Sequence, residues 1–125
     1  MGPDPNILIA ASDEALVLDL AAFAEDKHLN LIRARTLNET LLTLQERRID
    51  VLVLDAELLD QDCAFITIVN GMEENLPIIL CAETNTAEFE SKVRQQRIFF
   101  YHIKSFGPVD LQTAISNAIE KSSHH

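Results

Sequence analysis

The sequence predicts an α/β domain of the (βα)5 type, in which a doubly wound, parallel five-stranded sheet is covered by helices on both faces. Five short apolar runs suited to strands alternate with segments suited to amphipathic helices. The third run, VLVL at 51–54, has no polar alternation, which is typical of a strand buried on both faces. Strands that alternate with helices in this way are joined by right-handed crossovers, and such connections produce a parallel sheet.

The expected strands are short and rich in Ile, Leu, Val and Phe. They are ILIAA (7–11), LNLIRA (29–34), IDVLVLD (49–55), LPIILC (76–81) and IFFYHI (98–103). Because the carboxyl ends of parallel strands meet at one edge of the sheet, we expect the residues that follow these runs to lie close together.

Three of the expected helices have a clear apolar stripe. The stripes are Leu16, Leu20, Phe23 and Ala24, then Leu37, Leu41 and Leu44, and finally Leu111, Ala114, Ile115, Ala118 and Ile119. Thr36 and Glu39 have the spacing of a capping box, and Pro108 suits a first helical position. The helices expected near 63–73 and 85–96 have weaker patterns.

Length and composition indicate one domain and exclude several classes of protein. The 125 residues are 47% hydrophobic, which is enough for a single core. A formal net charge of −10 opposes binding to phosphate backbones and to anionic membranes, so we expect no direct nucleic-acid binding. No apolar run is long enough for a membrane span, and Cys63 and Cys81 lack metal-ligand spacing. We therefore expect a cytoplasmic protein with no membrane association.

Two charged residues stand at matching ends of predicted strands. Asp55 ends the third strand, where a carboxylate buried without a partner would be strongly destabilising. Lys104 directly follows the fifth strand, and its flexible ammonium is expected to reach Asp55. Asp55 is alternatively a strand-end residue bound by backbone N–H groups, but the position of Lys104 favours a functional site.

These segments together resemble the receiver domains of two-component response regulators. Receivers carry ILIVDDE at the first strand, a strand-terminal phosphoacceptor Asp, PVIxLTA at the fourth strand and YxxK-P-F at the fifth. This chain has ILIAASDE, VLVLD, PIILCAE and YHIKSF, followed by the amphipathic PVDLQTAISNAI. The resemblance implies a flavodoxin-like receiver fold over residues 5–121. We expect residues 122–125 to form a disordered tail, in which His124 and His125 resemble an affinity-tag remnant.

The resemblance also implies roles for individual residues. Asp55 corresponds to the phosphoacceptor, and Lys104 to the lysine that contacts the phosphoryl group. Tyr101 corresponds to the aromatic switch residue. Ala82 stands where the family has a Ser or Thr hydroxyl, so only its backbone is expected to contact the phosphoryl group.

The acidic pair that receivers place after the first strand is incomplete. Counted without gaps, Ala11 and Ser12 occupy its positions. A one-residue shift makes Asp13 the metal-binding acid, at the cost of a poorer core face for the first helix, and both alignments stay open. The resemblance implies Asp55, Asp13 and the backbone carbonyl of Glu57 as Mg²⁺ ligands, and with so few acids we expect Mg²⁺ to bind weakly or not at all.

Two functions follow from the resemblance. In the first, a histidine kinase phosphorylates Asp55, and the domain relays a conformational change to an effector domain or partner protein. We expect such a signalling domain not to be an enzyme. In the second, a degenerate pseudo-receiver acts as a protein-interaction or dimerisation module without phosphorylation. A flavodoxin-like cofactor protein is disfavoured, because the chain has 3 Gly and no phosphate-binding loop after the first strand.

Mixed charges near the fourth and fifth helices suggest a self-association surface. The cations are Lys92, Arg94 and Arg97, and the anions are Glu88, Glu90 and Asp110. Because opposite charges on one face suit a symmetric contact, we expect a weak, salt-sensitive homodimer.

Overall fold

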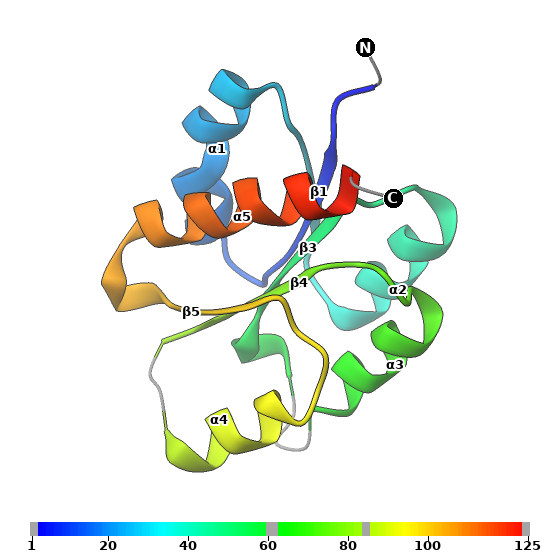
Figure 1. Ribbon diagram of the computed structural model, residues 1–125, viewed down its shortest axis with the longest axis vertical. Coiled ribbons are helices and arrows are strands. Elements are labelled where there is room, and N and C mark those ends of the chain that lie inside the picture. Colours follow the sequence, from blue (N-terminus) through cyan, green and yellow to red (C-terminus); the bar gives the residue numbers. More distant parts are fainter. Residues whose placement is uncertain (1–2, 60–62, 84–85, 124–125) are drawn as a thin grey trace.

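The computed structural model describes residues 3–59, 63–83 and 86–123, in which strands and helices alternate as predicted (Figure 1). The elements in chain order are β1 (Asn6–Ala10), α1 (Ala15–Lys27), β2 (Asn30–Ala34), α2 (Leu37–Glu46), β3 (Val51–Asp55), α3 (Ala64–Met72), β4 (Ile78–Ala82), α4 (Ala87–Arg94), β5 (Phe100–Ile103) and α5 (Pro108–Ser123). Short 3₁₀ turns follow β3 (η1, Ala56–Leu58) and β5 (η2, Lys104–Phe106).

The five strands form one parallel sheet in the order β2-β1-β3-β4-β5, which confirms the predicted doubly wound (βα)5 fold. The strand order reverses between β1 and β3, because the chain moves outward from β1 to β2 and then returns to the other side of β1. In the register, Asp55 pairs with Cys81 and Ala82 pairs with Ile103. The ends of β3, β4 and β5 therefore lie side by side at one edge of the sheet.

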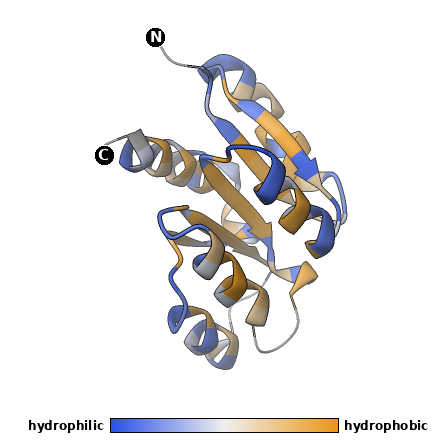
Figure 2. Cartoon of the chain, turned by 90° about the vertical axis from the view of Figure 1, so that its right-hand side faces the viewer, coloured by the Kyte–Doolittle hydropathy of each residue, from blue (hydrophilic) through white to orange (hydrophobic). Residues whose placement is uncertain are grey.

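Alternate strand residues point to two separate apolar cores, one on each face of the sheet. The core beneath α1 and α5 contains Ile7, Ile9, Leu16, Leu20, Val51, Val53, Ile79, Leu111 and Ile115. The core beneath α2, α3 and α4 contains Leu8, Leu44, Leu52, Leu54, Ile66, Val69, Ile78, Leu80 and Val93. Figure 2 shows the hydrophobic residues of the central strands lying between helices in which hydrophobic and hydrophilic residues are mixed. Burial on both faces explains why β3 and β4 lack polar alternation.

The predicted helix boundaries agree with the structure at α2 and differ at α5. The Thr36 hydroxyl oxygen accepts a hydrogen bond from the Glu39 N–H at 3.1 Å, as in a capping box, whereas the Glu39 carboxylate accepts from the Arg35 N–H. Helix α5 begins at Pro108 as expected, but it continues to Ser123. The expectation of a disordered tail from residue 122 is thus wrong for residues 122 and 123, while residues 124 and 125 lie outside the described part.

Some strands begin later than the sequence suggested. Strand β3 starts at Val51, and the carboxylate of the preceding Asp50 accepts a hydrogen bond from the Asn6 N–H at 2.8 Å. Within the described residues, no helix combines the length and apolar composition of a membrane span.

Candidate functional site

The predicted pair of Asp55 and Lys104 is present at the carboxyl edge of the sheet. The Lys104 Nζ lies 2.8 Å from Asp55 Oδ2, and the Glu57 N–H donates to Asp55 Oδ1 at 3.0 Å. Asp55 is the last residue of β3 and is completely buried. Both carboxylate oxygens therefore have a donor, which is what a buried carboxylate requires.

Lys104 also lies close to a second carboxylate. Its Nζ is 3.6 Å from Glu83 Oε1, just beyond the end of β4. Burial by itself lowers the pKa of the Lys104 ammonium, but the hydrogen bond and charge of Asp55, together with Glu57 and Glu83, outweigh it and raise the pKa above its ordinary value. Lys104 consequently stays charged at neutral pH.

Three carboxylates converge next to this pair. One oxygen each from Asp13, Asp55 and Glu57 lies within 4.8 Å of the others. Asp13 reaches the cluster although Leu16 and Leu20 still face the core, so the poorer helix core that the shifted alignment implied does not occur. Asp13 Oδ1 accepts a hydrogen bond from the Ala15 N–H at 2.9 Å, and this local turn leads the chain from the loop after β1 into α1.

The loop that carries Asp13 is held by a residue that the sequence reasoning missed. Arg33, near the end of β2, donates to the Ser12 carbonyl oxygen at 3.1 Å and to Glu14 Oε1 at 3.4 Å. These contacts bracket Asp13 on both sides. The sequence does show that Arg33 is a cation near the end of a strand that neighbours β1. It does not show that the Arg33 side chain turns toward the loop after β1.

The donor set at this edge fits a hard divalent cation. Mg²⁺ prefers carboxylate and carbonyl oxygens and usually retains several water ligands. Asp13, Asp55 and Glu57 supply such oxygens, and Asp13 and Glu57 are exposed to solvent. The sequence reasoning considered only the backbone carbonyl of Glu57, whereas the side-chain carboxylate also lies in the cluster.

A hollow of 220 Å³ adjoins the cluster, between η1 and the start of α4. Its lining residues are Ala56, Glu57, Ala82, Glu83, Thr86 and Phe89. Ala82 ends β4 and is buried, but it has no hydroxyl to offer a ligand in this hollow. Cys81, the strand neighbour of Asp55, is also buried, and its burial, followed by the charge of Asp55, raises the pKa of its thiol. Cys81 is therefore an inert core thiol.

Tyr101 does not take part in the Asp55 cluster. Its ring packs edge-on against Phe89 of α4, with centroids 6.3 Å apart. Its hydroxyl is buried and has no hydrogen-bond partner among the described residues. Burial, followed by the charge of Glu90, raises the pKa of the Tyr101 hydroxyl. The phenol thus occupies a partly apolar position between β5 and α4.

Several charges of the expected dimer surface have partners within the chain. Arg94 binds Glu90 one helical turn away at 2.7 Å, and Asp110 Oδ2 lies 3.5 Å from Nδ1 of the buried His102. Arg97 donates to the Asn70 carbonyl oxygen at 3.3 Å. The homodimer remains a prediction, and these contacts leave fewer charges for it.

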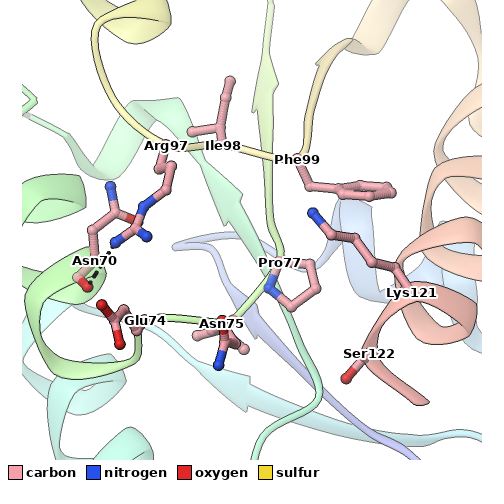
Figure 3. Close-up of a pocket in the computed structure, with 10 residues that line it drawn as sticks. Asn70, Glu74, Asn75, Pro77, Arg97, Ile98, Phe99, Lys121 and Ser122 are labelled. Atoms are coloured by element: carbon pink, nitrogen blue, oxygen red, sulfur yellow. Dashed lines mark hydrogen bonds between the residues drawn. The ribbon is translucent and has the colours of Figure 1, made fainter. Parts of the chain in front are cut away.

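A larger hollow, of 390 Å³, lies at the opposite edge of the sheet (Figure 3). Arg97 turns toward Asn70 on one side of it, and the Lys121 ammonium lies 5.4 Å from the centroid of the Phe99 ring on the other. This hollow borders the amino ends of β4 and β5, away from Asp55, and we assign no ligand to it.

Similarity to known proteins is found at the level of the structure and not at the level of the sequence. No family model and no curated protein matches the chain. The structure is similar to the signal receiver domain of an HD domain-containing protein from Pseudomonas fluorescens Pf-5, with TM-score 0.85, 21% identity and coverage of 98% of this chain and 99% of that chain.

Two further receiver domains show the same likeness. A CheY-like response regulator receiver domain protein from Methanospirillum hungatei JF-1 has TM-score 0.83 and 18% identity, with 95% of this chain and 96% of that chain covered. The receiver domain of the Francisella response regulator 1452 has TM-score 0.82 and 19% identity, with 96% and 100% covered. The chain therefore has the fold of response regulator receiver domains.

Proposed function

We propose that this chain is a receiver domain that accepts a phosphoryl group on Asp55 from a histidine kinase. The observation that supports the proposal most strongly is the buried Asp55 carboxylate, which meets the Lys104 ammonium at 2.8 Å beside two further carboxylates. A purely structural strand-end aspartate would also need a partner such as Lys104 when it is buried, but it would not need two further carboxylates beside it.

The chemistry assigned to the site is one phosphoryl transfer. A carboxylate oxygen of Asp55 attacks the phosphorus of the donor, and the bond from phosphorus to the donor's imidazole nitrogen breaks, with its electron pair leaving on that nitrogen. Lys104 stabilises the negative charge of the transferring group, because its ammonium already lies 2.8 Å from the Asp55 carboxylate. Water later cleaves the acyl phosphate and restores Asp55.

Asp13, Asp55 and Glu57 are the residues that would hold a divalent cation here. When bound, Mg²⁺ neutralises charge on the phosphoryl oxygens during transfer. Arg33 contributes indirectly, since it fixes the loop on either side of Asp13. The sequence predicts weak Mg²⁺ binding because it offers the carboxylates of Asp55 and Asp13 alone. The cluster also contains the Glu57 carboxylate, a third oxygen donor for the ion.

The relay of the signal is assigned to the region around α4, β5 and α5. A phosphoryl group on Asp55 would enter the edge that Lys104, Glu83 and the adjoining hollow share, so the contacts of Lys104 must rearrange. An effector domain or partner protein would read the resulting shift between two conformations. Tyr101, packed against Phe89, is the residue proposed to report that shift.

Incubation with acetyl phosphate and Mg²⁺, followed by intact mass measurement, tests the proposal. The expected result is a mass increase of one phosphoryl group in the wild type, lost on removal of Mg²⁺ and absent from Asp55→Asn. Acetate is the leaving group in this reaction, so no kinase is needed. An unchanged wild-type mass under these conditions would contradict phosphorylation of this chain.

The second candidate is a pseudo-receiver that binds partners without phosphorylation. Ala82 favours it, because this position lacks the hydroxyl that would bind a phosphoryl oxygen. So does Ala11, a buried apolar residue at a position of the acidic pair in the ungapped alignment. The acetyl phosphate experiment separates the two candidates, since only the first gains mass.

A further inference from the structure

We propose that the side-chain carboxylate of Glu57 is itself a ligand of the divalent cation and supplies the acid that the loop after β1 lacks. This inference rests on the proposed function and deepens it. The resemblance to receivers implied only the backbone carbonyl of Glu57. The two donors are distinguishable, because substituting the side chain leaves the carbonyl in place.

The position of Glu57 is fixed relative to the proposed phosphoacceptor. Its backbone N–H donates to Asp55 Oδ1 at 3.0 Å, which anchors the first turn of η1 directly beside that carboxylate. From this anchor, the Glu57 carboxylate lies within 4.8 Å of the oxygens of both Asp13 and Asp55. Because its backbone is already held, only the side-chain rotamers of Glu57 remain to be ordered when the carboxylate coordinates an ion.

The loop after β1 supplies one carboxylate to this cluster. Ala11 is buried and apolar, and the carbonyl oxygen of Ser12 is occupied by Arg33. Glu14 points to Arg33 as well, at 3.4 Å. Asp13 is therefore the acid of this loop that reaches the cluster, and Glu57 raises the number of carboxylates from two to three.

The charge balance at this edge favours an added cation. The Lys104 ammonium lies 2.8 Å from Asp55 and 3.6 Å from Glu83, while Asp13 and Glu57 each place a carboxylate oxygen within 4.8 Å of an Asp55 oxygen. Like charges at such distances repel, and a divalent cation relieves the repulsion.

Glu83 offers a matched control for Glu57. Both residues are exposed acids that line the same 220 Å³ hollow. Glu83 contacts Lys104 at 3.6 Å and is not a member of the three-carboxylate cluster. Replacing either acid removes one negative charge from the same edge, but only Glu57 is proposed to touch the ion.

Isothermal titration with MgCl₂ alone, on the wild type and on the variants Glu57→Ala, Glu57→Gln and Glu83→Gln, tests the inference. The two Glu57 variants should lose about tenfold or more in Mg²⁺ affinity, the scale expected when a ligating group is removed, while Glu83→Gln should lose much less. The increase in melting temperature on adding Mg²⁺ should shrink in the same order. Melts without Mg²⁺ verify that each variant is folded, and Glu57→Gln preserves side-chain size.

The outcomes separate this inference from the proposed function. If the wild type binds Mg²⁺ and Glu57→Ala binds it equally well, the side chain is not a ligand, and the proposed function stands with the backbone carbonyl alone. Equal losses in Glu57→Gln and Glu83→Gln would mean a general electrostatic effect and would also overturn the inference. No Mg²⁺ binding by the wild type would overturn both proposals.

Discussion

The side chains of Lys104 and Asp55 meet at 2.8 Å but are unequally buried, since 18% of the lysine side chain and 1% of the aspartate side chain is exposed. The lysine can reach water if its partner is lost, whereas the aspartate cannot. The two halves of the ion pair therefore contribute differently to stability. This asymmetry leads to the first prediction.

Lys104→Ala should lower the free energy of unfolding by about 3 kcal/mol, because among the described residues it leaves the buried carboxylate with only the Glu57 N–H as donor. Asp55→Asn should change it by no more than about 1 kcal/mol, since the lysine keeps Glu83 and solvent, and one of several crowded carboxylates loses its charge. Urea unfolding at neutral pH measures both. A Lys104→Ala variant as stable as the wild type would mean that Asp55 is effectively solvated.

Alkaline conditions should weaken the fold through the same pair. Folding raises the pKa of Lys104 above its ordinary value of 10.5, so its contribution to stability is fully present below that value and is lost as the pH rises through the raised native pKa. Urea unfolding at a series of alkaline pH values should show this loss in the wild type. The control is Lys104→Met, in which the decline should be shallower, and identical curves for the two proteins would refute the prediction.

Tyr101→Phe should be neutral or stabilising by up to about 1 kcal/mol. The Tyr101 hydroxyl is buried without a hydrogen-bond partner among the described residues, so its removal abolishes a desolvation cost and no bond. Thermal or urea unfolding tests this expectation. A clear destabilisation would show that the hydroxyl has a partner in solution.

Tyr101 is also a convenient spectroscopic probe, because the chain contains 1 Tyr and no Trp. Burial raises the pKa of its hydroxyl, so phenolate absorbance should develop at higher pH in the folded protein than in the urea-unfolded protein. Coincident titration curves would contradict the buried position of the hydroxyl.

Self-association should be weak and should vanish in moderate salt. Arg94 already binds Glu90 within the chain, whereas Lys92 is an exposed cation of α4 and is available to a partner molecule. Sedimentation at high protein concentration should show a dimer in low salt that Lys92→Glu weakens. A monomer under all conditions would rule out this surface.

Much of the fold could be predicted from the sequence, because each element carried a local signal. The unbroken apolar run of β3 indicated burial on both faces, and Pro108 marked the start of α5. The matching ends of the third and fifth strands were also sufficient to predict the pairing of Asp55 with Lys104. These features depend on periodicity and on the parallel arrangement of strands, which a sequence displays directly.

The rest of the site depends on how loops turn, and sequence patterns do not encode this reliably. Two alignments of the loop after β1 fit the sequence, and only one of them places Asp13 at the site. Neither alignment shows the hydrogen bond from the Ala15 N–H to Asp13 that forms the turn into α1. The Glu57 side chain was missed because a residue beyond a strand can point in several directions. Arg33 acts across two elements, a contact that only the folded chain reveals.

The identity of the phosphoacceptor is tested most directly by mapping the modified residue. After treatment with acetyl phosphate and Mg²⁺, borohydride reduces an aspartyl phosphate to homoserine, and peptide mass spectrometry then locates it. The account predicts homoserine at position 55 in the wild type and none in Asp55→Asn. Homoserine at another position such as Asp13, or at no position, would contradict the assignment of Asp55.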